Sequence, residues 1–144
     1  MKYVKGNLLE EFANGNIDVM VHGCNCFHTM GAGIAKQIKQ AYPAAYAADL
    51  NTPKGAPKKL GHYSAAKIGH NKYIINAYTQ YRYGQGNEAN MKAIAKVMAS
   101  VRIDFGMLRV GIPKIGAGLA GGDWYEIESI IDSIGFPNIV CVVL

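Results

Sequence analysis

The stretch MGAGIAKQI, at residues 30–38, joins an apolar segment to an amphipathic one and decides how the chain folds around it. The preceding segment, residues 18–23, is short and rich in valine, which is typical of a buried strand. The following segment, residues 33–41, repeats apolar residues at helical spacing. Glycines at such a junction let the amides of the helix start face outward, where an anion can bind. The sequence therefore predicts a phosphate site at residues 30–34, here called the first loop.

A second glycine-rich stretch, KIGAGLAGGDW at residues 114–124, has the same surroundings. An apolar segment precedes it at residues 108–113, and an amphipathic one follows at residues 124–134. Ligands of open α/β sheets collect beyond the carboxyl ends of the strands, so we expect this second loop, residues 114–122, to share one cleft with the first. One such turn is weak evidence, but two favour a diphosphate site. Neither loop has the GxxxxGK[ST] pattern, or the dinucleotide pattern of GxGxxG followed by an acidic residue about 20 residues further on, which disfavours a P-loop nucleotidase and a Rossmann dehydrogenase.

The remaining pattern predicts an α/β fold, a three-layer α/β/α sandwich around a central mixed sheet of about six strands. No segment has the composition of a linker, so we expect one domain over residues 1–144. Besides the segments above, we expect strands at residues 2–5, 62–68, 72–78 and 138–144, a helix at residues 87–101 and an exposed loop at residues 51–59.

The composition is that of a globular chain, because 50% of its 144 residues are hydrophobic. No apolar run is long enough for a spanning helix or a secretion signal, so we expect a soluble, cytoplasmic monomer without a membrane partner. The three cysteines form no CxxC pair; we expect no metal or other cofactor, and interpret Cys24 and Cys26 as packing residues. The formal charge of +5 suits an anionic ligand, and the scattered basic residues favour a phosphorylated small molecule over nucleic acid.

Two longer segments resemble the ligand-binding loops of a known family, the macrodomains. They are VHGCNCFHTMGAGIAK at residues 21–36 and IPKIGAGLAGGDW at residues 112–124. The resemblance runs from KGNLL near the start to the final strand, and it implies the macrodomain fold with ADP-ribose or a derivative as ligand. Within the family, the chain is similar to the branch that holds the yeast ADP-ribose 1″-phosphate phosphatase and the terminal ADP-ribose protein glycohydrolase. The string HGCNC at residues 22–26 favours the phosphatase.

The resemblance also implies a set of ligand contacts. Asn25 would lie at the distal ribose, while Val142 stands where many relatives stack an aromatic residue on adenine, so that stacking is in question here. The adenine would contact Gly6, Asn7 and Leu8. The two phosphates would take the amides of Gly31, Ala32, Gly33 and Ile34 in the first loop, and those of Ile115, Gly116, Ala117, Gly118 and Leu119 in the second.

Departures from related hydrolases limit the chemistry that the resemblance implies. Ala35 or Lys36 stands where one hydrolase class carries an acidic residue, so that mechanism is not expected. Gln80 and Ala120 occupy the places of the lysine and the aspartate of the glycohydrolase, so its lysyl-adduct route is not expected either. Asp123 either shifts into the role of that aspartate or caps the helix that follows it, and capping is the simpler interpretation.

His22, Asn25 and His28 are the candidate catalytic residues. His22 is expected at the mouth of the cleft, where an imidazole could donate a proton, attack phosphorus or orient water, or it is a satisfied histidine at a strand end. His28 could reach a phosphate on the distal ribose or point into solvent. Asn25 could position a ribose hydroxyl or serve as a turn residue. Asn76, a polar residue in the apolar run YIINAY, either faces the ligand or bonds within the core.

These observations support three hypotheses for the function. The first is an enzyme that hydrolyses ADP-ribose 1″-phosphate to ADP-ribose and phosphate. The second is a hydrolase that removes ADP-ribose from protein or nucleic acid, and the third is a reader that binds ADP-ribose without reaction. Residues 79–86, TQYRYGQG, could contact the exposed end of the ligand or a larger, ADP-ribosylated partner.

Overall fold

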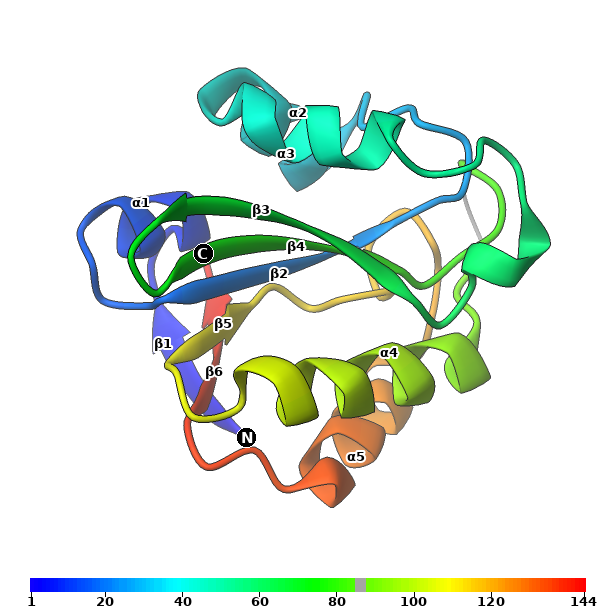
Figure 1. Cartoon of the computed structure of the whole chain (residues 1–144). Helices are drawn as coiled ribbons and strands as arrows, with labels where there is room; N and C mark the ends of the chain where they lie inside the picture. The colour runs from blue at the N-terminus through cyan, green and yellow to red at the C-terminus, as the bar shows by residue number, and fades with distance from the viewer. Residues whose placement is uncertain (85–87) are drawn as a thin grey trace.

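The computed structural model describes residues 1–84 and 88–144, and Figure 1 shows helices packed against a sheet. A short 3₁₀ helix, Pro57–Lys59, lies between the third helix and the third strand. The other elements follow one another as β1 (Lys2–Lys5), α1 (Leu8–Ala13), β2 (Val19–Cys24), α2 (Gly33–Ala41), α3 (Pro43–Leu50), β3 (Tyr63–Gly69), β4 (Lys72–Tyr78), α4 (Met91–Phe105), β5 (Val110–Ile112), α5 (Trp124–Ile134) and β6 (Ile139–Val143).

The strands of the described residues form one six-stranded sheet in the order β1-β6-β5-β2-β4-β3. Each neighbouring pair is parallel except β3 and β4, which are antiparallel. The mixed sheet of the prediction is therefore confirmed. Because β2 and β5 are parallel neighbours, their carboxyl ends lie at the same edge of the sheet. The loops that follow the two strands therefore begin at that edge.

Helices cover both faces of this sheet, which confirms the predicted α/β/α sandwich (Figure 1). α4 and α5 pack on one face, and α1, α2 and α3 pack on the other. Side chains of a strand alternate between the faces, so Val19 and Val21 of β2 join the α4–α5 side while Met20 joins the side of α1 to α3. A central strand covered on both faces favours an apolar run, which Val19, Met20 and Val21 supply at the start of β2.

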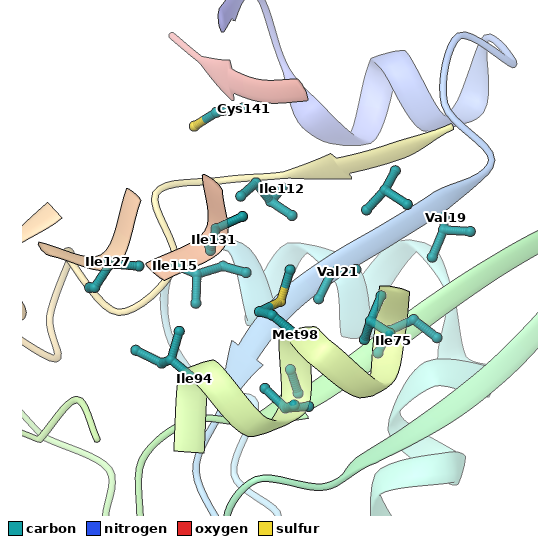
Figure 2. Packing of buried hydrophobic residues seen from close by; sticks show 14 residues of the cluster. Val19, Val21, Ile75, Ile94, Met98, Ile112, Ile115, Ile127, Ile131 and Cys141 are labelled. Atoms are coloured by element: carbon teal, nitrogen blue, oxygen red, sulfur yellow. The ribbon is translucent and has the colours of Figure 1, made fainter. Parts of the chain in front are cut away.

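The larger buried cluster lies between the sheet and α4 and α5, and Figure 2 shows its side chains at close range. Val21 of β2 and Ile75 of β4 pack in one cluster with Met98 of α4, and Ile127 of α5 belongs to the same group. Burying a side chain of this size stabilises the fold by about 1.5–3 kcal/mol. Ile115 of the second loop is 2% exposed and belongs to this cluster, so the core fixes that loop in place.

Two helices were not predicted from the sequence, and each has a weak periodic pattern. α1 is a six-residue helix in which Leu8 and Phe12 are buried, which is too short for a repeating stripe. α3 has the sequence PAAYAADL, whose alanines give little contrast between a buried face and an exposed one. Tertiary packing selects both helices, because their few buried residues complete the cluster on the second face of the sheet.

The other predicted boundaries differ from the structure by a few residues. β5 covers only Val110–Ile112 of the predicted strand at residues 108–113, and the predicted loop at residues 51–59 contains the 3₁₀ helix. α4 begins at Met91 because the Asn90 side chain accepts a hydrogen bond from the Ala93 amide and caps it. Residue 87, the predicted start, lies outside the described residues. In the described parts of the chain, no helix combines the length and the apolar character needed to cross a membrane.

Candidate functional site

The two glycine-rich loops line one cleft of about 390 Å³ at the carboxyl edge of the sheet. Gly23 and Cys24 end β2 on one side of it, and Pro113 follows β5 on the other. Of the predicted contacts in this region, Ala117 is not among the lining residues. Those that line the cleft are Asn25, Gly31, Ala32, Gly33, Ile34, Ile115, Gly116, Gly118 and Leu119.

The start of α2 opens into this cleft without a side-chain cap. Ala32 is its N-cap residue and makes no side-chain hydrogen bond, and no acidic residue lies in the first turn. The backbone before the helix has an unusual conformation, because His28 and Met30 have positive φ angles of 61° and 37°. Positive φ costs energy for residues other than glycine, and such strain is often kept at binding sites. The first turn of α2 thus presents amides that a ligand anion can satisfy.

The second loop is closed on itself and packed against two helices. The Gly122 amide donates to the Gly116 carbonyl over 2.7 Å. Gly116 has a φ of 75°, and a Cβ added there would lie 3.1 Å from Cδ1 of Ile94. Asp123 then caps α5, because its side chain accepts from the Tyr125 amide over 2.9 Å. The capping interpretation of Asp123 is confirmed, so α5, unlike α2, has a side-chain cap at its start.

A second cavity of about 410 Å³ continues from the cleft, because Ile34, Pro113 and Lys114 line both. The predicted adenine contacts lie here, since this cavity is lined by Gly6, Asn7, Leu8 and Val142. The side-chain oxygen of Asn7 also accepts from the Glu10 amide over 3.1 Å and caps α1. The two cavities together form an elongated site that runs past both loops.

His22 does not lie at the mouth of the cleft, so that expectation is wrong. Its side chain is fully buried, and Nε2 lies 2.7 Å from Oδ1 of Asn76. Asn76 donates through Nδ2 to the Ala45 carbonyl and to Ser64 Oγ, which turns its oxygen toward His22 and assigns the proton to Nε2. Burial lowers the pKa of His22, against the opposing effects of the Asn76 bond and of the Asp49 charge. His22 and Asn76 are thus satisfied residues of the core, because β2 continues for two residues beyond His22.

Asn25 and His28 have different positions relative to the cleft. Asn25 lines it, donates from Nδ2 to Thr29 Oγ1 over 2.6 Å and accepts through Oδ1 from the Phe27 amide over 2.8 Å. It is therefore both a turn residue and a cleft residue. His28 is not among the lining residues; it is partly buried, and its Nε2 lies 3.1 Å from Thr52 Oγ1.

Asp49 is a cleft residue that the sequence did not reveal. It lies near the end of α3, is 1% exposed, and is the one acidic residue among the described groups that line the cleft. Tyr78 donates its hydroxyl to Asp49 Oδ1 over 2.7 Å. Lys59 Nζ lies over the ring of the same tyrosine, 4.5 Å from the ring centroid. A single aspartate in an alanine-rich segment carries no motif, so only the fold brings it to the site.

Other predicted positions are placed as follows. Gln80 and Ala120 line the cleft, and so does Tyr83 from the 79–86 stretch, while residues 85 and 86 of that stretch lie outside the described residues. Burial raises the pKa of the Cys24 thiol well above its usual range, and the Asp49 charge acts in the same direction. A thiol in this state is a poor nucleophile, which supports the interpretation of Cys24 as a packing residue.

Comparison with known proteins gives a family and several relatives. The model of the Macro domain family matches residues 21–131. The chain is 39% identical over 142 residues to an uncharacterized 17.5 kDa protein from the tk-vs intergenic region of Enterobacteria phage T4, covering 92% of this chain and 88% of that protein. It is 26% identical over 168 residues to the ADP-ribose 1″-phosphate phosphatase of Debaryomyces hansenii, with 92% of each chain covered.

A third relative comes from Thermus aquaticus. Its DNA ADP-ribosyl glycohydrolase is 25% identical over 136 residues, which cover 91% of this chain but only 36% of the longer protein. The solved macrodomain of Thermus aquaticus DarG has a TM-score of 0.76 at 23% identity and covers 99% of this chain and 97% of that structure, which is a likeness of fold. The family match over residues 21–131 and this shared fold together show that the chain belongs to the Macro domain family.

Proposed function

We propose that this macrodomain binds ADP-ribose and its derivatives along the two adjoining cavities. The observation that carries the proposal is the meeting of both glycine-rich loops on one cleft, with the amides of the α2 start left without a side-chain cap. A diphosphate has the charge and the length to accept hydrogen bonds from the backbone amides of both loops. Adenosine then lies in the cavity of Asn7 and Leu8, and the distal ribose lies near Asn25.

The reaction that we propose is the hydrolysis of ADP-ribose 1″-phosphate to ADP-ribose and phosphate. Support comes from the HGCNC string and from the yeast phosphatase that matches over 92% of both chains. Asn25 is the residue proposed to orient the distal ribose, because its amide lies in the cleft and is fixed by Thr29. In this proposal His22 does not contact the substrate. Its role is structural, because it forms a buried hydrogen bond with Asn76.

A second candidate is the removal of ADP-ribose from nucleic acid or protein. The similarity to the Thermus aquaticus glycohydrolase favours it, and the exposed Tyr83 at the cleft could contact a larger substrate. Gln80 and Ala120, which line the cleft at the places of the lysine and aspartate of the related glycohydrolase, count against a lysyl-adduct route. A reader that binds without reaction is the third candidate.

The test is a calorimetric titration with ADP-ribose, followed by a phosphate-release assay on ADP-ribose 1″-phosphate. Micromolar binding with phosphate release supports the phosphatase. Binding without release, combined with loss of label from ADP-ribosylated nucleic acid or protein, would select the second candidate, and binding without any turnover would select the reader. Asn25→Ala should lower turnover at least tenfold, whereas the exposed control Asn138→Ala should not. Failure to bind ADP-ribose would overturn the proposal.

A further inference from the structure

The carboxylate of Asp49 is built into the floor of the cleft. Its Oδ1 accepts the Tyr78 hydroxyl, which itself lies 2.8 Å from Ser64 Oγ and 3.4 Å from Thr52 Oγ1. Within the described residues, Oδ2 accepts no hydrogen bond, although the side chain is 1% exposed and lines the cleft. The arrangement fixes the direction of the carboxylate and leaves acceptor capacity for a group that enters the cleft.

Lys59 compensates the cost of this buried carboxylate. The lysine is 5% exposed, donates from Nζ to the Cys26 carbonyl over 3.1 Å and stacks on the Tyr78 ring. Burial lowers the pKa of Lys59, while the nearby Asp49 charge acts to raise it, so the two charges favour each other. A buried carboxylate is retained where it has a compensating charge and hydrogen-bond donors. Tyr78 and Lys59 supply part of that need, and a bound ligand can supply the remaining donors.

The chemistry of the ligand decides which part meets Asp49. Phosphate groups carry negative charge and acceptor oxygens, so a carboxylate repels them. Ribose hydroxyls, in contrast, can donate hydrogen bonds to the carboxylate. The adenine amino group is also a donor, but the adenine cavity at Asn7 and Leu8 does not include Asp49. Asn25 and Asp49 line the same cleft, beyond the stretch that the two cavities share at Ile34, Pro113 and Lys114. The distal ribose is the part of the ligand that fits.

We propose that Asp49 is a ligand-contacting, specificity-determining residue that accepts hydrogen bonds from the hydroxyls of the distal ribose. This inference rests on the proposed function, because it takes ADP-ribose to be the ligand. Asp49 gives the cleft its preference for ADP-ribose over ADP, which has the same diphosphate and adenosine but no second ribose. In a 1″-phosphorylated substrate, the phosphate is directed away from Asp49. Tyr78 is a positioning residue, because it acts on the ligand only through the carboxylate.

The experiment measures calorimetric affinities of ADP-ribose and ADP for the full chain and for Asp49→Asn. The asparagine keeps an oxygen that can accept from Tyr78, so we expect it to fold, and thermal unfolding checks this. Asp104→Asn is a matched control, because Asp104 also accepts from a tyrosine, Tyr63 Oη to Oδ2 over 2.6 Å, but is exposed on α4. We expect Asp49→Asn to weaken ADP-ribose binding at least tenfold, to leave ADP binding within about twofold, and Asp104→Asn to change neither.

A second variant tests the positioning by Tyr78. Tyr78→Phe keeps the ring beneath Lys59 and removes the hydroxyl, so it should weaken ADP-ribose binding by a smaller factor and again leave ADP unchanged. If Asp49→Asn binds ADP-ribose as the parent does, or if the parent binds ADP as tightly as ADP-ribose, the role of Asp49 is refuted while the diphosphate site stands. If the parent binds neither nucleotide, both this inference and the proposed function fail.

Discussion

A chain of buried hydrogen bonds connects His22 in the core to the carboxylate in the cleft. His22 bonds Asn76, Asn76 donates to Ser64, and the Ser64 and Tyr78 hydroxyls lie within hydrogen-bond distance, with Tyr78 donating to Asp49. Each member of the chain fixes the rotamer of the next. A polar network of this kind stabilises one arrangement of the core, because breaking a member leaves a buried partner unsatisfied.

His22 makes the stability of the protein depend on pH. Its folded-state pKa is lowered from the ordinary value of 6.5, so the unfolded state takes up a proton at a higher pH than the folded state does. The stability contributed by neutral His22 is therefore complete above about pH 6.5 and decreases as the pH falls toward the folded-state pKa. Urea unfolding of the parent between about pH 7.5 and pH 5 should show a slope of up to about 1.4 kcal/mol per unit from this group.

The comparison that isolates this effect is His22→Gln, whose amide can still donate to Asn76 but does not titrate. The variant should be less stable at neutral pH. Its free energy of unfolding should also lack the dependence on pH that His22 contributes. Equal slopes for parent and variant would show that His22 does not take up a proton on unfolding in this range.

At the level of elements, the two helices that follow the loops begin in different ways. α2 begins at Gly33 without a side-chain cap, and α5 begins after Asp123, whose carboxylate accepts from the Tyr125 amide. A side-chain cap satisfies amides within the protein and leaves fewer for a ligand. The amides at the start of α2 are therefore available to bind an anion. In the second loop, an anion would instead bind the amides that precede Asp123.

Asp123→Ala should lower the free energy of unfolding by about 1 kcal/mol, since the amide cap is lost, and Asp123→Asn should retain most of it. ADP-ribose affinity and turnover should be unchanged in both variants, because the side chain does not line the cleft. Urea unfolding and the phosphate-release assay measure the two effects. Lost turnover in Asp123→Asn at normal stability would assign the carboxylate to the reaction, and unchanged stability in Asp123→Ala would contradict the capping role.

At the scale of the whole molecule, the net charge of +5 is spread over the surface, and one exposed lysine lies at the site. Lys114 lines both cavities where they adjoin, close to the position proposed for the diphosphate. An exposed lysine attracts an anionic ligand electrostatically, and dissolved salt screens this attraction.

ADP-ribose affinity should therefore fall several-fold as NaCl is raised from about 0.05 to about 0.5 M. Lys114→Gln should weaken binding at low salt and reduce the dependence on salt, while Lys58→Gln, an exposed lysine outside both cavities, should behave as the parent does. Calorimetry at several salt concentrations provides the measurement. Identical salt dependence in the parent and Lys114→Gln would exclude an electrostatic role for Lys114.

The sequence by itself determined the layers of the fold and the position of the two loops. The apolar runs of the strands, the helical spacing of α2, α4 and α5, and the glycines between them are local signals, since each reflects the period or the backbone freedom of one short segment. The cap at Asp123 belongs to the same class, because a cap involves residues that are neighbours in the chain.

The tertiary structure alone decided that Asp49 faces the cleft and that His22 does not. His22 and Asp49 look alike in sequence, as single ionisable residues in apolar surroundings, yet the first is enclosed by Asn76 and the second lines the cleft. Their environments come from segments far apart in the chain: α3 carries Asp49 to β4, where Tyr78 orients it. Burial and orientation of a side chain depend on how several helices and strands pack together. The sequence pattern of one short segment does not predict that packing.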